Sequence, residues 1–197
     1  AARQAFAAGN LPYSIELYEH ILNQTKNAPL IDDVIHYGAI LRKTKQLSRA
    51  NQHYIKYTAQ FPVNINLIQN ACNCWIELKD FEHCRLVLRK ALSENSNNPA
   101  LLLTQGFTEL SAGNTEVACK IFETILSIDS HHFDAWFNLA VAKAKDGRLE
   151  DALACFKQAH RLQSNHQLLN ANIITILQDL NRIEEAWKKL NELTPIM

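Results

Sequence analysis

The most reactive side chains in this sequence are five cysteines. They stand at positions 72, 74, 84, 119 and 155. Their odd number and irregular spacing fit no disulfide framework, so they favour free thiols in a reducing compartment. Zinc binding is the other chemistry to consider, because Cys72, Cys74 and Cys84 lie close to His83 in the sequence. Zinc needs four converging ligands, whereas helix residues two apart, such as Cys72 and Cys74, point to different faces. We therefore predict small buried thiols and no metal site, with a disulfide as the alternative.

Motifs that would indicate catalysis are missing. The sequence has no H-E-x-x-H, no G-x-S-x-G, no P-loop and no G-x-G-x-x-G. We expect this chain to have no catalytic activity and no cofactor.

The first residues of the sequence, AARQAFAAGN, lack methionine and resemble the middle of a helix. We therefore expect a piece of a longer protein, which leaves room for a catalytic domain elsewhere.

The composition is that of a folded chain without a charged partner. Hydrophobic residues make up 47% and charged residues 20%, which permits a substantial core. The 20 basic and 20 acidic residues cancel. This balance argues against nucleic acid, because domains that bind it present a basic face. No stretch approaches the roughly 18 consecutive apolar residues of a membrane-spanning helix.

The dominant feature is an internal repeat with a period of 34 residues. Similar residue types recur at the same places in five consecutive repeats without insertion or deletion, and an incomplete repeat precedes them. The repeats are 1–30 (partial), 31–64, 65–98, 99–132, 133–166 and 167–197. Repeats of this length bury their apolar faces by stacking on their neighbours, so we expect one domain over 1–197.

Within each repeat, apolar residues follow helical spacing in two blocks separated by a break, as in SAGNT at 111–115. Asn98 and Asn114 are expected to cap the helices that follow them. Each repeat is therefore predicted to be two antiparallel helices. Small residues at positions eight and twenty mark the helix crossing, and a large residue at position 24 fills the space beside it. The three sets include Gly38, Cys72, Gly106 and Ala140; Ala50, Cys84, Ala118 and Ala152; and Tyr54, Leu88, Phe122, Phe156 and Leu190.

This pattern resembles the tetratricopeptide repeat, with its W-x2-L-G-x2-Y…A-x3-F…P consensus. The best match is Trp136, Leu139, Ala140, Ala152 and Phe156, and the resemblance covers essentially the whole chain. It implies an all-α fold: a right-handed superhelical α-solenoid of antiparallel helix pairs. In that family the first helices of successive repeats line a concave groove that holds a peptide or a partner. The turn glycine is absent from three repeats, a substitution that we expect a turn to tolerate.

Two groups of residues fall on positions that the resemblance places in the groove. Leu103, Phe107, Phe137 and Val141 are apolar and are expected to cluster there as a binding patch, unless the superhelix curls enough to bury them. Position six holds Asn70, Asn138 and Asn172, with Asn73 one turn from Asn70. Side-chain amides both donate and accept, so such a row can pair with a peptide backbone of any sequence. The row is similar to the asparagine ladder of O-linked N-acetylglucosamine transferase, although His36 and Thr104 interrupt it; chance placement is the alternative.

Trp187 stands at position 21, which in an internal repeat packs against the first helix of the next repeat. A terminal repeat normally needs a polar outer face. Trp187 therefore predicts either truncation before another domain or a self-association surface.

These observations favour a protein–protein interaction scaffold that holds a peptide or partner protein in its groove. One alternative is a substrate-presenting module of a larger bacterial glycosyl-, sulfo- or methyltransferase. Another is an assembly factor of a secretion or pilus system, in the periplasm or at a membrane. The unpaired thiols favour the cytoplasm over the periplasm.

Overall fold

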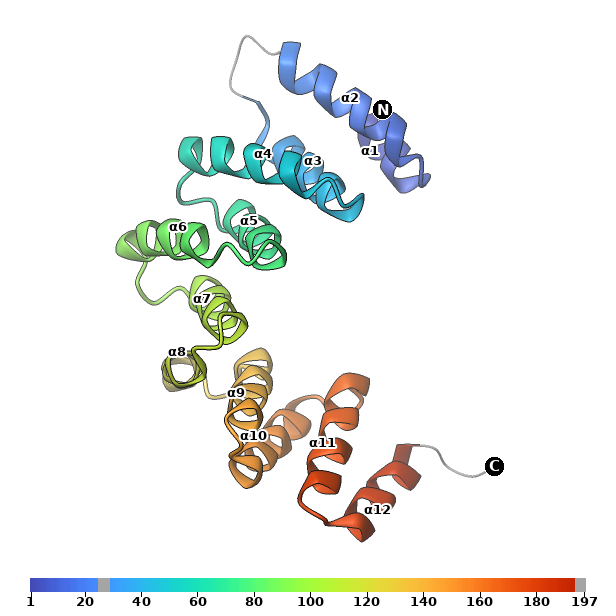
Figure 1. Ribbon diagram of the computed structural model, residues 1–197, viewed down its shortest axis with the longest axis vertical. Helices are drawn as coiled ribbons and strands as arrows, with labels where there is room; N and C mark the ends of the chain where they lie inside the picture. The colour runs from blue at the N-terminus through green and yellow to red at the C-terminus, as the bar shows by residue number, and fades with distance from the viewer. Residues whose placement is uncertain (25–28, 194–197) are drawn as a thin grey trace. The chain divides into compact units, whose positions relative to one another are not determined.

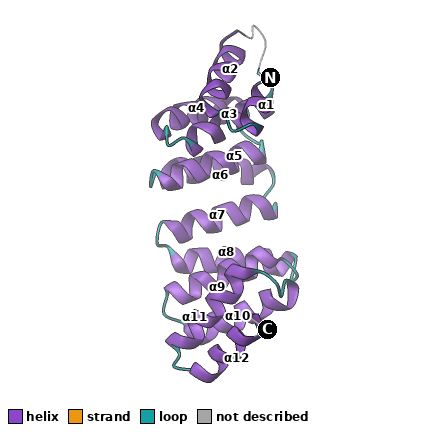
Figure 2. Cartoon of the chain, turned by 90° about the vertical axis from the view of Figure 1, so that its right-hand side faces the viewer, coloured by secondary structure: helices purple, strands orange, loops and turns teal. Residues whose placement is uncertain are grey.

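A computed structural model describes residues 1–24 and 29–193, and the described chain is built of twelve helices without a strand (Figures 1 and 2). The all-α prediction is confirmed. The helices are α1 Ala2–Ala7, α2 Leu11–Gln24, α3 Ile31–Lys43, α4 Leu47–Gln60, α5 Ile65–Glu77, α6 Phe81–Glu94, α7 Pro99–Ser111, α8 Thr115–Ile128, α9 Phe133–Lys145, α10 Leu149–Leu162, α11 Gln167–Asp179 and α12 Ile183–Leu193. None of them in the described ranges is long and apolar enough to cross a membrane.

The chain divides into two compact halves, an N-terminal half over Ala1–Leu101 and a C-terminal half that begins at Leu102. In the N-terminal half, α1 packs on α2, α2 on α3, α3 on α4 and α5, and α5 on α4 and α6. In the C-terminal half, α9 packs on α8 and α10, and α11 packs on α10 and α12. Each first helix that follows another repeat in the same half thus packs against the second helix of that repeat, and α5 also packs against the first helix, α3. Helices α3, α5, α7, α9 and α11 begin at residues 31, 65, 99, 133 and 167, where the sequence repeats begin.

The residue before α5, α7, α9 and α11 caps each of these helices with its side chain. Asn64 accepts from the Leu67 N–H at 2.9 Å, and Asn98 accepts from the Leu101 N–H at 3.1 Å. In the C-terminal half the corresponding residues are histidines, whose Nδ1 atoms accept in the same way. His132 and His166 accept at 3.3 and 3.2 Å from Ala135 and Leu169. All four side chains satisfy an N–H group that the helix leaves unpaired.

The cap predicted at Asn114 is wrong. Its side chain makes no capping bond to α8. Its amide instead donates to the Glu109 carboxylate at 2.6 Å. The carboxylate is a stronger acceptor than a neutral group, and this bond ties the turn back to the preceding helix.

The turn inside each repeat needs one residue in the left-handed region. Gly113 and Gly147 have φ of 88° and 76°. In the three repeats without glycine, Lys45, Lys79 and Asn181 hold φ of 59°, 59° and 58° at the same position. A left-handed conformation costs a non-glycine residue roughly 1–2 kcal/mol. The turn geometry is therefore imposed by the packing of the two helices and not by the local residue.

The predicted small–large contact at the helix crossing is present. A Cβ atom added to Gly38 would lie 2.6 Å from Cζ and 2.7 Å from the hydroxyl oxygen of Tyr54, which is fully buried. In the next repeat the same two positions hold Cys72 and Leu88, both buried.

All five cysteines are buried and free, and burial raises the pKa of the Cys74 thiol to about 11. They pack as small side chains, as expected.

Gly38→Ala is expected to lower the free energy of unfolding by about 1–3 kcal/mol, because the new methyl group overlaps the Tyr54 ring. Urea denaturation measures this loss. Adding Tyr54→Leu, the residue found at the matching position 88, should recover part of it. Losses that simply add in the double variant would show that the two side chains do not compete for space.

His53 is a buried histidine of the N-terminal half. It is 8% exposed, its Nε2 lies 2.7 Å from the Val34 carbonyl oxygen, and its ring contacts those of Tyr37, Tyr54 and Tyr57. Burial lowers its pKa from 6.5 to about 4, and the positive charge of Lys56 contributes in the same direction. The folded state therefore holds His53 as a neutral ring, with its Nε2–H donating to Val34.

We expect stability to fall as the pH drops from about 6.5 to about 4. The unfolded chain protonates His53 across this range and the folded chain does not, so up to about 3 kcal/mol is lost. Urea denaturation at pH 7.5 and pH 4.5 measures the change. His53→Val, which places the residue of position 87 here, should remove most of this dependence; an unchanged pH profile would contradict the assignment.

Candidate functional site

The apolar residues expected in the groove lie on α7 and α9 of the C-terminal half. Phe107 is 42% exposed, whereas Leu103, Phe137 and Val141 are half-buried. Leu103 and Phe107 are one turn apart on α7, and Phe137 and Val141 are one turn apart on α9. All four therefore keep part of their surface open to a ligand.

Phe137 belongs to an aromatic cluster at the start of α9. Its ring centroid lies 6.1 Å from Phe133, 5.8 Å from His166 and 5.7 Å from Phe156, with Phe156 edge-on. Phe133 is in turn 5.0 Å from His166. Because His166 also caps α11, the cluster links α9, α10 and the first turn of α11. These contacts hold Phe137 in one position, and a fixed aromatic side chain loses little entropy when a ligand binds.

A pocket of about 300 Å³ opens between α9, α10 and α11. Val141 and Asn172, both expected in the groove, line it together. Its lining is apolar at Val141, Ala144, Leu149, Phe156 and Ile176 and polar at Lys145, Asn172, Thr175 and Asp179. Such a combination suits an apolar group with polar atoms attached.

Charge at this pocket is balanced between two helix ends. Lys145 is the last residue of α9, and Asp179 is the last residue of α11. The pocket therefore contains one cation and one carboxylate. A ligand with polar or zwitterionic ends matches it better than a strongly charged one.

The predicted asparagines have two different surroundings. The side-chain amides of Asn70 and Asn138 donate to the carbonyl oxygens of Asn66 and Asp134, one turn back in their own helices, at 2.8 Å. Each of these bonds orients the amide and uses one of its two N–H groups. Asn172 lines the pocket of the C-terminal half. Asn70 and Asn73 lie one turn apart on α5, in the N-terminal half, and both are half-buried.

Trp187 is 61% exposed on α12 and shares one helix face with two other exposed residues. Ile183 is 45% exposed and Leu190 is 37% exposed. The residues at the position of Trp187 in the two preceding repeats, Cys119 and Leu153, are buried. An apolar face that is covered in those repeats is therefore open in the last one.

The sequence did not single out Phe133 or His166. A weak signal existed for His166, since it follows Asn64, Asn98 and His132 at intervals of 34 residues. Nothing in the periodicity indicates that a capping histidine also contacts the aromatic side chains of the preceding repeat.

Residues 133–166 match the family model for the tetratricopeptide repeat. The fold is similar to a tetratricopeptide repeat protein from Parabacteroides merdae, with a TM-score of 0.79 and 17% identity over 98% of this chain and 75% of the other. It is also similar to a thermophilic TPR protein of Thermus thermophilus, with a TM-score of 0.70 and 18% identity over 90% and 95% of the two chains. A third similar structure is MamA AMB-1, with a TM-score of 0.61 and 18% identity over 81% and 95%. No curated protein matches by sequence. At these identities the structural likeness concerns the fold.

Proposed function

Since this chain is a tetratricopeptide-repeat protein, with the fold of that family and one repeat that matches its model, we propose that it acts as a protein–protein interaction scaffold. The proposed binding surface in the C-terminal half comprises Leu103, Phe107, Phe137, Asn138, Val141 and Asn172, and Asn70 and Asn73 are its counterparts in the N-terminal half. The observation that carries the proposal is the pocket that Val141 and Asn172 line together. The two residues lie on different helices, and both were chosen from repeat positions alone.

The ligand that fits this surface is an extended peptide with an apolar side chain. That side chain enters the pocket over Phe156, where burial of a leucine-sized group contributes about 1.5–3 kcal/mol. The amides of Asn138 and Asn172 pair with the peptide backbone, which makes binding tolerant of sequence between anchors. Lys145 and Asp179 then favour peptides that carry polar or zwitterionic groups beside the anchor.

The double change Val141→Ser with Asn172→Ala is expected to weaken peptide binding at least about tenfold, because it removes the apolar wall and an amide of the pocket. Peptides are first selected by phage display on the unmodified protein, and affinities are then measured by isothermal titration calorimetry. Leu86→Ala is the matched control, since Leu86 is 62% exposed on α6 and lies outside the pocket. Equal affinity of the double variant and the unmodified protein, with both folded by circular dichroism, would reject the pocket as the binding site.

The same surface would serve the alternative function, presentation of a substrate to a larger glycosyl-, sulfo- or methyltransferase. A catalytic domain encoded in the same reading frame would support that function.

We place the scaffold in the cytoplasm and not the periplasm, because five buried free thiols suit a reducing compartment.

We further propose that the α12 face formed by Ile183, Trp187 and Leu190 mediates self-association. The corresponding residues of α10, Leu149, Leu153 and Phe156, lie on a helix that packs against α11. A two-fold contact between two copies would let the same face of each α12 cover the other.

Trp187→Ser is expected to convert a concentration-dependent dimer into a monomer, because the change removes the largest exposed apolar side chain of this face. Sedimentation velocity between about 5 and 200 μM measures the association. Leu86→Ser, an equally exposed apolar residue on α6, should leave the dimer intact. An unmodified protein that stays monomeric throughout this range would contradict the proposal.

A further inference from the structure

Histidine, and not asparagine, caps the two first helices that border the pocket of the C-terminal half. The Nδ1 atoms of His132 and His166 accept from main-chain N–H groups at the starts of α9 and α11, at 3.3 and 3.2 Å. In the N-terminal half, Asn64 and Asn98 make the same bond with their amide oxygens. Both residue types satisfy the cap, but only the histidine ring can gain a proton between about pH 8 and pH 5.

His166 is the cap that also contacts the aromatic side chains of the preceding repeat. Its ring centroid lies 5.0 Å from that of Phe133 and 5.8 Å from that of Phe137, both on α9. Within residues 1–24 and 29–193, His132 makes no such ring contact. His166 therefore bonds to α11 through a nitrogen and packs on α9 through its ring.

The helix that His166 caps contributes four lining residues to the pocket. These are Asn172, Thr175, Ile176 and Asp179. A capping bond holds the first turn of its helix in the helical form, and the later turns continue from there. His166 thus stands where the two first helices of the proposed peptide surface meet, and it is in contact with both.

The bond to Leu169 determines which form of the His166 ring the folded structure holds. Nδ1 can accept the Leu169 N–H only when it carries no hydrogen, so the proton of the neutral ring is on Nε2. A second proton would go to Nδ1 and turn this acceptor into a donor, so that two N–H groups face each other. It would also place a positive charge at the start of α11, where the helix dipole disfavours a cation. The protonated ring must therefore leave the cap, and its contacts with Phe133 and Phe137 change with it.

The charged groups on the helices around His166 do not hold its ring in place. On α9 the charged residue beside the ring contacts is Asp134, which is exposed. In the last turn of α10, Arg161 donates to a neighbouring amide oxygen at 3.2 Å, and His160 Nε2 lies 3.0 Å from Lys189 Nζ of α12. No ion pair joins a charged side chain to His166 in the described part of the chain. The faces of the phenylalanine rings attract an imidazolium, but this attraction leaves the N–H group of the helix without its cap.

We propose that His166 is a positioning residue of the peptide surface and that it makes peptide binding weaken as the pH falls. This inference rests on the scaffold function proposed above. At pH 7.5 the neutral ring caps α11 and holds Phe137 against α9. At pH 5.5 the protonated ring leaves the cap, which loosens Phe137 and the start of α11 together. The partner is therefore bound at neutral pH and released in a mildly acidic solution.

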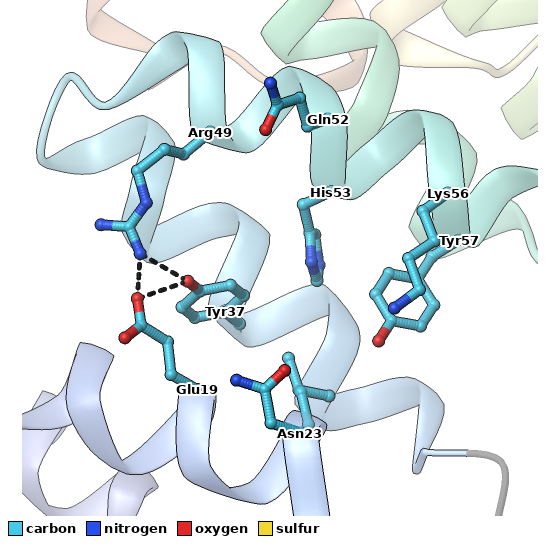
Figure 3. Close-up of a pocket in the computed structure, with 9 residues that line it drawn as sticks. Glu19, Asn23, Tyr37, Arg49, Gln52, His53, Lys56 and Tyr57 are labelled. Carbon is cyan, nitrogen blue, oxygen red and sulfur yellow. Dashed lines mark hydrogen bonds and ion pairs between the residues drawn. The ribbon is translucent and has the colours of Figure 1, made fainter.

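The N-terminal half offers an internal comparison, because it also has a pocket with a histidine (Figure 3). This pocket of about 330 Å³ lies where α2 and α4 flank the Tyr37 ring. Glu19, Tyr37 and Arg49 form a closed triangle of polar contacts on one side of it. His53 lines the pocket, but its Nε2 meets the Val34 carbonyl oxygen and caps no helix. Burial lowers the pKa of His53 to about 4, so its ring stays neutral at pH 5.5.

The test measures the affinity of one peptide at pH 7.5 and at pH 5.5 by isothermal titration calorimetry. The peptide is selected by phage display and has blocked ends and no Asp, Glu or His, so its own charge does not change. We expect the unmodified protein to bind about fivefold or more weakly at pH 5.5. His166→Asn, which places the capping residue of Asn64 and Asn98 before α11, should bind at pH 7.5 and lose most of this fall. His132→Asn is the matched control, because it changes the other histidine cap, and it should keep the fall.

A second readout needs no peptide. In ¹⁵N-labelled protein, the Leu169 backbone amide and the Asn172 side-chain NH₂ signals should shift with pH together with the His166 ring, and should stay in place in His166→Asn. A peptide that does not bind at pH 7.5 would reject the scaffold function, and the NMR titration would still decide the role of His166. The inference is overturned if the unmodified protein, folded by circular dichroism, binds equally at both pH values. It is also overturned if His166→Asn keeps the fall in affinity, or if the Leu169 signal shifts without that of Asn172.

Discussion

The close approach of the two helices in each repeat is the constraint on which the rest of the structure depends. In the four full repeats before the last, a residue no larger than cysteine stands at position eight and a large side chain at position 24, and the contact between Gly38 and Tyr54 shows most directly how the two fit. Neither helix pair can bury its apolar face alone, so each repeat relies on its neighbours. The packing of the two helices also sets the left-handed turns at Lys45, Lys79 and Asn181 that join them. The helix crossing imposes a conformation that these residues would not adopt by preference.

The difference between positions at the helix crossing and positions outside it determines where a binding site can form. Positions at the crossing tolerate few residue types, and positions outside it are free to vary. Most residues that line the pocket of each half occupy such free positions. In the C-terminal half, Val141 and Asn172 line a pocket with an apolar floor at Phe156. In the N-terminal half, the corresponding freedom on second helices allows Gln52 and Lys56 to build a polar pocket. One architecture therefore carries two pockets whose linings differ in polarity.

The two halves also differ in how their helices are capped. Asn64 and Asn98 use amide oxygens, whereas His132 and His166 use ring nitrogens that protonation would convert from acceptors into donors. His166 additionally contacts Phe133 and Phe137. The cap of α11 is thus physically connected to the proposed peptide surface, whereas the capping amides of Asn64 and Asn98 cannot titrate.

The sequence by itself determined the period, the helix pairs, the small–large crossing and the exposed Trp187, because each depends on which face of a helix a residue occupies. It did not determine distances between side chains on different helices. That Asn70 and Asn138 bond back to their own helices could not be read from a row of asparagines. Nor could the triangle of Glu19, Tyr37 and Arg49, whose members come from three helices. Periodicity specifies the direction of a side chain, but only the packing of one helix on another decides which polar groups meet.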